Sequence, residues 1–343
     1  MNTVDIAIVG ASGAIGAALI EALDNSLLEL DFGVGELYLL ASARSDGETR
    51  IFRQRPLLLE SLDGFDFSRV QLAFFATPAA VSSEYVQVAT EQGCRVIDFS
   101  TRFRAEPGVP LVVAGVNSDE LADADHRLVA LPDALATDLS LIVQPIHRVM
   151  EISRVHVASY QSVSSAGQAG TRELARQTSS LLNGMPVEPE LFPQQIAFNI
   201  VPEVGGLDQD GHSRAERDLL AELRKLMRGE VIPLSVTCVQ VPIFYGSCQA
   251  ISLEMRYPAE VEEIVAILRA VEGLELADPV QAYSTSLATI EKGSQFRCSV
   301  GRIRASLAID NGMDLWTVSD AVKNSAISNA LWVASDLIKY ASS

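Results

Sequence analysis

Two kinds of hydrophobic pattern alternate through the first half of the chain. Short, mostly apolar runs at Val4–Val9, Glu36–Leu40, Val70–Ala76 and Cys94–Phe99 are typical of buried strands. The segment Val81–Gln92, between the last two runs, has helical spacing. Because strands alternate with helical segments, the pattern predicts an α/β fold with a mostly parallel, doubly wound sheet.

The second half of the chain has a different pattern. Leu234–Ile243 and Cys248–Met255 are predicted strands, and apolar residues alternate with polar ones along the second. Such a strand buries one face and leaves the other for water or a partner. Glu216–Met227 is predicted to be an amphipathic helix. We therefore expect an α+β second domain.

A sharp turn joins a strand to a helix near the middle of the chain. The predicted strand Leu128–Leu131 ends at Pro132, and Asp133 stands at the N-cap position of a helix that begins at Ala134. The first turn of a helix offers N–H groups and the positive end of a dipole, so a reactive thiol there would have a lowered pKa. This chain has alanine at that place and no thiol.

Three glycines follow the first predicted strand and precede a helical pattern. Their spacing, G-x-x-G-x-x-G, is a variant of the dinucleotide-binding fingerprint. Gly10 allows the turn, Gly13 allows close approach of a pyrophosphate, and Gly16 lets the helix pack on the strand. Glycine turns also occur here without a ligand, but the strand–turn–helix context favours nucleotide binding. The predicted contacts of this loop are Gly10, Ser12, Gly13, Ala14, Ile15 and Gly16.

The end of the second strand favours NADP over NAD. An NAD site usually has an acidic residue here for the ribose 2′-hydroxyl, yet none precedes Asp46. Ser42, Arg44 and Ser45 instead suit a 2′-phosphate, through charge-assisted hydrogen bonds, although an ordinary exposed loop is the alternative. Thr77 follows another strand end, where ligands bind in such sheets, and it joins the predicted cofactor-binding residues.

Composition narrows the class of partner. The chain has 343 residues, 48% of them hydrophobic, which is enough for two domains with large cores. A formal net charge of −18 argues against binding to nucleic acid or to an anionic membrane. The four cysteines, at positions 94, 238, 248 and 298, have no metal-ligand spacing and fit a reducing compartment. With no apolar run of membrane length and no signal-peptide pattern, we expect a cytoplasmic protein without a metal site.

Several segments of the chain resemble the aspartate-semialdehyde dehydrogenase family. They are Gly10–Gly16, Leu39–Gly47, Val109–Asn117, His156–Arg172 and Asn311–Asn329. The resemblance therefore covers nearly the whole chain.

The resemblance implies a domain organisation and an assembly. Residues 1–130, together with 318–343, would form a Rossmann-like NAD(P)-binding domain, and residues 131–317 would form a dimerisation and substrate domain. The last helix would thus return to the nucleotide domain. The family also implies a homodimer that binds NADP and a small molecule.

Four residues match family positions around the substrate. Gln161 matches the glutamine that orients the acyl group, and Arg104 matches an arginine that contacts phosphate. Glu222 and Lys225 match positions that contact the substrate amine and phosphate. From the residues alone, the i, i+3 spacing of this last pair places both on one side of a helix, where a solvated ion pair is the commoner outcome.

The chain departs from the family at the positions that carry its chemistry. The family forms a thioester through a cysteine, and this cysteine aligns with Ala134. The arginine that clamps the substrate carboxylate aligns with Gln240, and the histidine base aligns with Ser247. Glutamine cannot make the bidentate charged contact of arginine, and serine is a poor base near neutral pH. The pattern is that of the Usg-type branch of the family, whose members lack the catalytic pair.

Three functional hypotheses follow from this pattern. The first is a non-catalytic, NADP-binding relative, a pseudoenzyme with a regulatory or partner role. The second is an active semialdehyde dehydrogenase of amino-acid biosynthesis with a substitute nucleophile. Of the possible substitutes, Cys248 is expected to point away from Ser247, and Asp133 is expected to cap the helix. The third is an NADP-dependent reductase that transfers hydride without a covalent step.

Overall fold

The protein folds as two units. A computed structural model describes residues 2–25, 30–122, 126–292 and 297–341. Unit 1 comprises Met1–Asp133 and Ala326–Ser343, and unit 2 comprises Ala134–Ser325. The sequence placed the second boundary at 318 instead of 326. Residues just before 326 remain with unit 2 because the Ser325 hydroxyl donates a 2.8 Å hydrogen bond to Asp138 of that unit.

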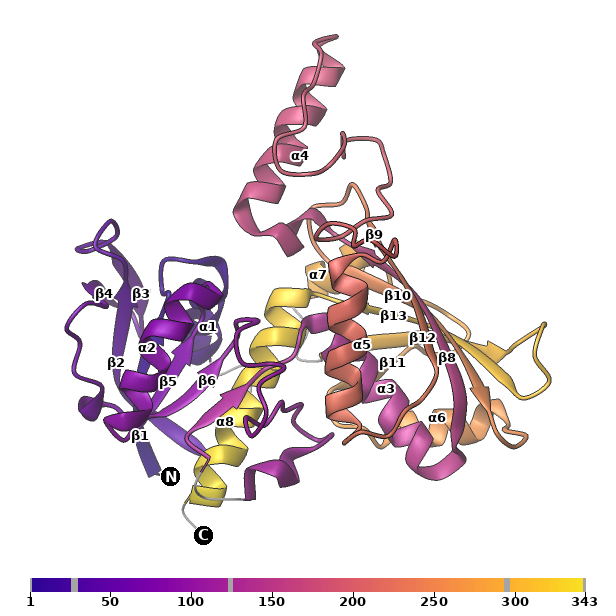
Figure 1. The fold of residues 1–343 in the computed structure, drawn as a ribbon, viewed down its shortest axis with the longest axis horizontal. Coiled ribbons are helices and arrows are strands. Elements are labelled where there is room, and N and C mark those ends of the chain that lie inside the picture. The colour runs from indigo at the N-terminus through magenta and orange to yellow at the C-terminus, as the bar shows by residue number, and fades with distance from the viewer. Residues whose placement is uncertain (1, 26–29, 123–125, 293–296, 342–343) are drawn as a thin grey trace. The chain divides into compact units, whose positions relative to one another are not determined.

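Unit 1 is built on one seven-stranded sheet. Its strands are β1 (Asn2–Val9), β2 (Phe32–Ala41), β3 (Thr49–Phe52), β4 (Arg55–Ser61), β5 (Leu72–Phe75), β6 (Arg95–Asp98) and β7 (Leu128–Ala130). Its helices are α1 (Ala14–Asn25), α2 (Ala79–Glu91) and α8 (Ser328–Ala341), with short 3₁₀ turns at Phe67–Arg69 and Ser118–Ala122. The strand order is β3-β4-β2-β1-β5-β6-β7, and all neighbours are parallel except β3 and β4 (Figure 1). The chain adds β2, β3 and β4 on one side of β1 and then β5, β6 and β7 on the other side. The predicted doubly wound sheet is therefore confirmed.

The central strands of unit 1 are covered on both faces. Ile6 and Ile8 of β1 and Phe74 and Phe75 of β5 have no exposed surface. Successive residues of a strand point to opposite faces, so burial of neighbouring positions requires cover on both. The right-handed crossovers β1–α1–β2 and β5–α2–β6 run in opposite directions across the sheet, so α1 and α2 lie on its two faces.

The C-terminal helix α8 packs within unit 1. The Asn329 side chain accepts a hydrogen bond from the Ala114 N–H (2.9 Å) and donates one to the Val112 carbonyl (3.0 Å). The Ser118 hydroxyl donates to Asp336 at 2.6 Å. The last helix therefore belongs to unit 1.

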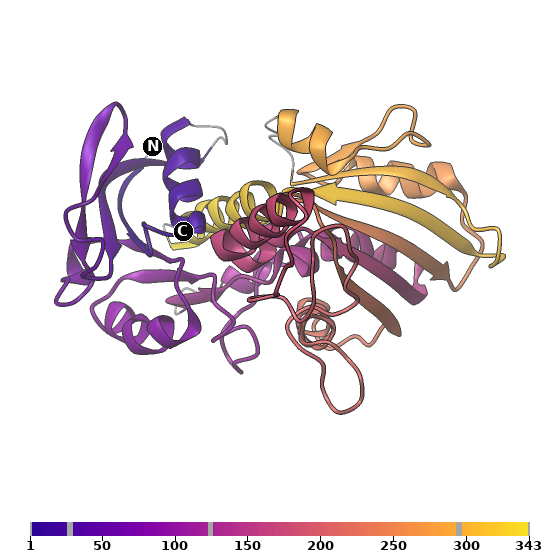
Figure 2. The same ribbon diagram turned by 90° about the horizontal axis from the view of Figure 1, so that it is seen from above.

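Unit 2 is built on a six-stranded sheet. Its strands are β8 (Ile152–Gln161), β9 (Leu234–Gln240), β10 (Ser247–Met255), β11 (Leu274–Leu276), β12 (Cys298–Ala305) and β13 (Gly312–Ser319). Its helices are α3 (Ala134–Met150), α4 (Gly167–Leu182), α5 (Arg214–Leu226), α6 (Val261–Arg269) and α7 (Ser286–Lys292), with a 3₁₀ turn at Val163–Ala166 and a π-helix at Ala321–Ile327. The order is β11-β12-β13-β10-β8-β9, in which β10 is antiparallel to β8 and β13, and β8 is parallel to β9. The long strands β10 and β13 run side by side (Figure 2).

Helices cover one face of the unit 2 sheet. α3, α5 and α6 pack against one another and against the strands (Figure 1). Along β10, Ile251, Leu253 and Met255 are buried while Ser252 and Glu254 are partly exposed, which confirms the predicted alternation. The other face is therefore the one available to water or a partner.

The end of β9 differs from the prediction. The strand predicted over Leu234–Ile243 ends at Gln240, three residues early. Pro242 has no N–H with which to continue a ladder, so the chain turns away before it. This places Gln240 at the last position of the strand.

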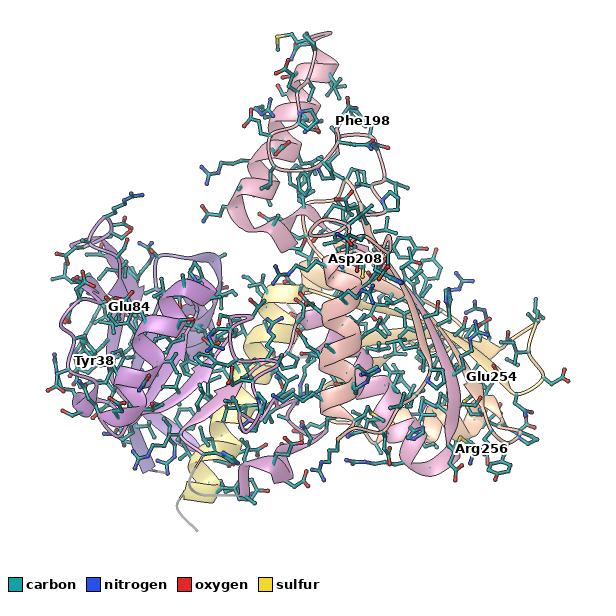
Figure 3. All side chains as sticks on the ribbon, viewed as in Figure 1. Tyr38, Glu84, Phe198, Asp208, Glu254 and Arg256 are labelled. Carbon is teal, nitrogen blue, oxygen red and sulfur yellow. The ribbon has the colours of Figure 1, made fainter. Side chains whose placement is uncertain are left out.

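An arm leaves the unit 2 sheet after the 3₁₀ turn at Val163–Ala166. It consists of α4 and the chain up to residue 213, and α4 projects away from the strands (Figure 1). The Glu173 carboxylate accepts hydrogen bonds from the backbone of Glu190 and Leu191, and the Gln177 amide oxygen accepts two more. These hydrogen bonds from the backbone to α4 side chains hold the segment after α4 against that helix. Phe198 of the arm is 67% exposed (Figure 3).

Candidate functional site

The glycine turn of unit 1 is tightly constrained. Gly10 has φ of +90°, and a Cβ atom there would lie 2.3 Å from the Ala76 carbonyl oxygen. A Cβ at Gly16 would lie 2.3 Å from the Gly10 oxygen and 2.7 Å from the Ala11 Cα. A Cβ at Gly13 would meet the Gly10 oxygen at 3.3 Å and nothing else within 4 Å. Thus Gly10 makes the turn, Gly16 allows helix and strand to pack, and the side of Gly13 is open.

This turn fits a dinucleotide pyrophosphate. It lies at the carboxyl end of β1, where the strand order reverses and where such sheets bind ligands. Ala14, Ile15 and Gly16 form the first turn of α1, whose N–H groups have no acceptor within the helix. An anion at this place would receive those N–H groups and the positive end of the α1 dipole. Ser12, an exposed residue of the turn, supplies the polar side chain of the predicted set, whose other members are glycine, alanine and isoleucine.

The loop after β2 presents the residues expected at a 2′-phosphate. Ser42 and Arg44 are exposed and Ser45 is half-buried. The Ser45 N–H donates to the Ser42 carbonyl at 2.9 Å, which closes a turn between them. Glu48 further along the loop is paired with Arg50 at 3.2 Å.

A buried carboxylate network lies behind Thr77 in unit 1. Asp98, the last residue of β6, has no exposed surface and accepts hydrogen bonds from the hydroxyls of Ser82 and Ser100, both at 2.6 Å. Ser82 in turn shares a 3.1 Å hydrogen bond with Thr77. Burial raises the pKa of the Asp98 carboxyl above its usual value, while the hydrogen bonds from Ser100 and Ser82 and the charge of Arg104 act in the opposite direction. The sequence analysis found Thr77 and missed Ser82, Asp98 and Ser100, which lie in the first turn of α2, at the end of β6 and just after it.

Arg104 lies close to the junction between strand and helix. Its guanidinium donates to the Phe99 carbonyl at 3.0 Å and is 4.0 Å from the Asp133 carboxylate. The Arg104 side chain is 14% exposed and that of Asp133 is 52% exposed. Unit 1 therefore brings Arg104 close to Asp133, the last residue of that part of the unit.

In unit 2, α3 begins at Ala134, which is half-buried. Asp133 accordingly occupies the predicted N-cap position. Asp138 lies one turn further along α3, on the same face as Ala134, and accepts hydrogen bonds from the hydroxyls of Ser319 (2.5 Å) and Ser325 (2.8 Å). The Ala134 face of α3 is thereby turned toward the end of β13. The sequence analysis did not single out Asp138, whose only local signal is a charged residue on the apolar side of a helix.

Four polar side chains form a row across one end of the unit 2 sheet. Gln240 of β9 is paired in register with Gln161 of β8, Gln161 with Ser247 of β10, and Ser247 with Ser319 of β13. We call Gln240, Gln161, Ser247 and Ser319 the polar row. At about 4.8 Å between strands, it spans about 14 Å. All four are more than nine-tenths buried, so the structure brings together the three predicted residues Gln161, Gln240 and Ser247.

Two glutamines of this face, Gln240 and Gln249, donate to backbone carbonyls. The Gln240 amide donates to the Gln161 carbonyl at 2.8 Å. Gln249 lies two residues beyond Ser247, on the same face of β10, and its amide donates to the Leu135 carbonyl of α3 at 3.4 Å. Its oxygen, Oε1, is buried without a hydrogen-bond partner. The sequence carried a signal for Gln249, because it is the polar residue at a position where Ile251 and Leu253 are apolar.

The four cysteines are buried and form no disulfide within the described residues. Cys248 is paired in register with Tyr160, so it points away from Ser247 to the opposite face of the sheet, as expected. Burial raises the pKa of Cys94 to about 12 and that of Cys248 to about 11, and it raises the pKa of Cys298 well above its usual value. Cys238 is 0% exposed. Protonated, buried thiols are poor nucleophiles.

The predicted charged pair lies on α5. A capping box of Ser213 and Glu216 begins this helix. Glu222 is buried and Lys225 is half-buried, so this pair is not the fully solvated one that commonly occurs at such spacing. His147 near the end of α3 accepts a hydrogen bond from the Ile152 N–H at 3.0 Å and lies 3.4 Å from Glu230, which is a packing role.

The described residues contain neither a candidate metal-binding cluster nor a helix that could span a membrane. Within the described ranges, no group of three histidine, cysteine or acidic side chains could hold a metal ion. No helix in those ranges is long and apolar enough to cross a membrane.

Comparison with known proteins assigns both halves of the chain to semialdehyde dehydrogenases. The NAD binding domain of semialdehyde dehydrogenase matches residues 5–124, and the dimerisation domain of semialdehyde dehydrogenase matches residues 143–323. The expected fold, an N-terminal Rossmann-like NAD(P)-binding domain followed by an α+β dimerisation domain, is therefore confirmed.

Individual relatives match over the full length. The chain is 37% identical over 336 residues to aspartate-semialdehyde dehydrogenase of Shewanella violacea, with 98% of each chain covered. It is 39% identical over 338 residues to the USG-1 protein homolog of Pseudomonas aeruginosa, again with 98% of each covered. The crystal structure of aspartate semialdehyde dehydrogenase II from Vibrio cholerae superposes with a TM-score of 0.91 at 35% identity, covering 98% of this chain and 99% of that one.

Proposed function

The chain belongs to the aspartate-semialdehyde dehydrogenase family, and from this premise we propose that it is an NADP-binding member without the phosphorylating dehydrogenase activity. One observation carries the proposal: α3 begins at Ala134, where the family's chemistry needs a thiolate. The helix N-terminus at this position would activate a cysteine, but alanine has no thiol.

The other losses point the same way. Ser247 and Gln240 stand in the polar row, where the resemblance expects a histidine base and an arginine clamp. Removal of a covalent nucleophile alone typically lowers kcat by about 10⁶-fold, and residues that act as a unit fail together. Residual binding by the scaffold cannot form a thioester.

Neither candidate substitute nucleophile is well placed. Cys248 faces away from Ser247 and has a pKa of about 11. The Asp133 side chain is 52% exposed, and its carboxylate lies 4.0 Å from the Arg104 guanidinium, which pairs with it. A reductase that transfers hydride without a covalent step would need neither residue, and the assay described next detects it.

The decisive assay is turnover of aspartate semialdehyde with NADP and phosphate. We expect no NADPH formation by the protein, while the Vibrio cholerae enzyme in the same buffer provides the positive control. Robust turnover that is abolished by Asp133→Asn or by Cys248→Ser would contradict the proposal, because one of these residues would then supply the nucleophile. NADPH consumption with an aldehyde in the absence of phosphate would instead support the non-covalent reductase.

We further propose that the protein is a homodimer through the open face of the unit 2 sheet. Tyr160 and Trp316 lie on that face with ring centres 5.8 Å apart, and Ala158 and Ala250 lie between them in register with Trp316. All four are only partly exposed, and such a flat, small-residue surface can pack against a copy of itself.

Light scattering tests this assembly. The protein at micromolar concentration should have the mass of a dimer, and Ala250→Arg, which places a charge at the centre of the face, should produce monomers. Ala266→Arg, on the exposed side of α6, is the matched control and should remain dimeric. A monomeric wild type would refute the proposal.

A further inference from the structure

The polar row carries no charge. Gln240, Gln161, Ser247 and Ser319 are amides and hydroxyls, and Gln249 adds a third amide to the same face. Each of these five side chains is more than nine-tenths buried. A charged side chain that contacts the row is Asp138, which accepts hydrogen bonds from the hydroxyls of Ser319 and Ser325.

Two of the amides have a fixed orientation. Gln240 is hydrogen-bonded to the Gln161 carbonyl at 2.8 Å, and Gln249 is hydrogen-bonded to the Leu135 carbonyl at 3.4 Å. A backbone carbonyl can only accept, so in both glutamines the NH₂ group occupies that side and the oxygen, Oε1, points elsewhere. The two side chains therefore present acceptors to the site.

One of these acceptors lacks a partner among the described residues. The Gln249 oxygen is buried and has no hydrogen bond, whereas the Gln240 oxygen is not among the buried atoms without a partner. A buried acceptor without a donor is costly, and native proteins rarely retain one. A ligand that donates hydrogen bonds would remove this cost.

We propose that the polar row binds the uncharged, hydrogen-bond-donating end of a small molecule, such as a carboxamide or a hydroxyl, and rejects a carboxylate. The inference rests on the proposed function, in which this site binds a ligand without forming a covalent bond to it. A carboxylate would face the oxygens of Gln240 and Gln249 with no cation in the row to offset its loss of hydration. An ammonium group would be desolvated with no carboxylate in the row to pair with it.

A matched set of probes distinguishes these ends. Succinamide, succinate and 1,4-diaminobutane have the same four-carbon length and carry uncharged, negative and positive ends. Their binding to the full-length protein saturated with NADP is measured by calorimetry or by saturation-transfer NMR. We expect the Kd for succinamide to be at least about tenfold lower than for either charged probe, the effect of leaving one buried polar group mismatched.

Substitutions in the row should redirect this preference. Gln240→Arg supplies a cation and should reverse the order in favour of succinate. Gln240→Glu keeps the size of the side chain and should shift the preference toward 1,4-diaminobutane, which keeps the test open if the larger arginine is not accommodated. Gln249→Leu removes the unpartnered oxygen and should weaken succinamide about tenfold. Ser235→Arg, at an exposed position of β9, the strand that contains Gln240, is the control and should leave the Kd of each probe unchanged.

Each outcome bears on the inference separately from the proposed function. Tighter binding of succinate or 1,4-diaminobutane by the wild type would overturn the inference, as would binding of none of the probes while NADP still binds. The proposed function would survive all three results. It fails instead if the sample turns over aspartate semialdehyde, a measurement made without the probes.

Discussion

The candidate site of unit 1 is formed by backbone atoms, whereas that of unit 2 is formed by side chains. In unit 1 the nucleotide loop is made of backbone: a left-handed glycine at Gly10, a close contact at Gly16 and the N–H groups of the first turn of α1. In unit 2, under the function proposed above, the family's chemistry would need three side chains, at the positions of Ala134, Gln240 and Ser247. A backbone site persists as long as the fold does. A side-chain site can be lost by three substitutions that leave the fold intact.

The residues at these three positions fit the fold of unit 2 without steric strain or an unpaired buried charge. Ala134 begins α3 without strain, since alanine is the best helix former. Gln240 and Ser247 fill buried strand ends with neutral groups, and Gln240 gains a hydrogen bond to the neighbouring strand. A buried arginine or histidine without its partner would have been costlier. The chain thus retains a TM-score of 0.91 to an aspartate semialdehyde dehydrogenase structure.

The backbone site of unit 1 should be the most sensitive to a single added methyl group. In Gly16→Ala the new Cβ would lie 2.3 Å from the Gly10 oxygen and 2.7 Å from the Ala11 Cα, so the turn itself must move. We expect about 3 kcal/mol of destabilisation and at least a hundredfold weaker NADP binding, measured by urea unfolding and calorimetry. Gly33→Ala, where nothing lies within 4 Å, is the control. If Gly16→Ala binds NADP normally, the loop does not form the pyrophosphate site.

A cysteine introduced at position 134 of unit 2 should have a much lower thiol pKa than the native cysteines. In Ala134→Cys the sulfur stands at the N-terminus of α3, so its pKa should fall below the usual value of about 8.5. The native cysteines are buried, with pKa values of about 12 for Cys94 and about 11 for Cys248. At pH 7 the variant should react with Ellman's reagent about a hundredfold faster than the wild type.

The pH profile of that reaction identifies the cause. Its rate should reach half of its plateau below pH 8, because the thiolate is already favoured there. A half-maximum near pH 9 would mean that the α3 N-terminus does not activate the position. We still expect no turnover of aspartate semialdehyde by Ala134→Cys alone, since Gln240 and Ser247 remain.

The smallest effect should be at the edge of the nucleotide site, where a side chain and not the backbone selects the cofactor. Arg44→Ala should weaken NADP about tenfold, roughly 1.4 kcal/mol, while NAD binding changes little. Arg50→Ala is the matched control, because that arginine is already paired with Glu48 at 3.2 Å. If the wild type binds NAD as tightly as NADP, Arg44 does not contact a 2′-phosphate.

The amino-acid sequence by itself determined the local features of this protein. Periodicity located β1, β2, β5, β6 and β7 of unit 1 and β9 and β10 of unit 2 to within a few residues, because burial of a strand imprints a period on the residues that form it. The other strands were not predicted. Residue identity alone established the glycine turn and the lack of a thiol at Ala134. The family resemblance supplied the return of the C-terminal helix to unit 1, which the pattern of apolar residues does not contain.

Only the tertiary structure decided which distant side chains meet. Gln161 and Gln240 are 79 residues apart in the chain, and Asp138 and Ser319 are 181 apart. Their contacts depend on strand register and on the face that α3 presents, and both are set by pairing along whole elements. The polar row, the unpartnered oxygen of Gln249 and the Asp98 network of unit 1 arise in this way. Local sequence patterns report whether a residue is buried, whereas the neighbour it meets there is fixed by the packing of the whole unit.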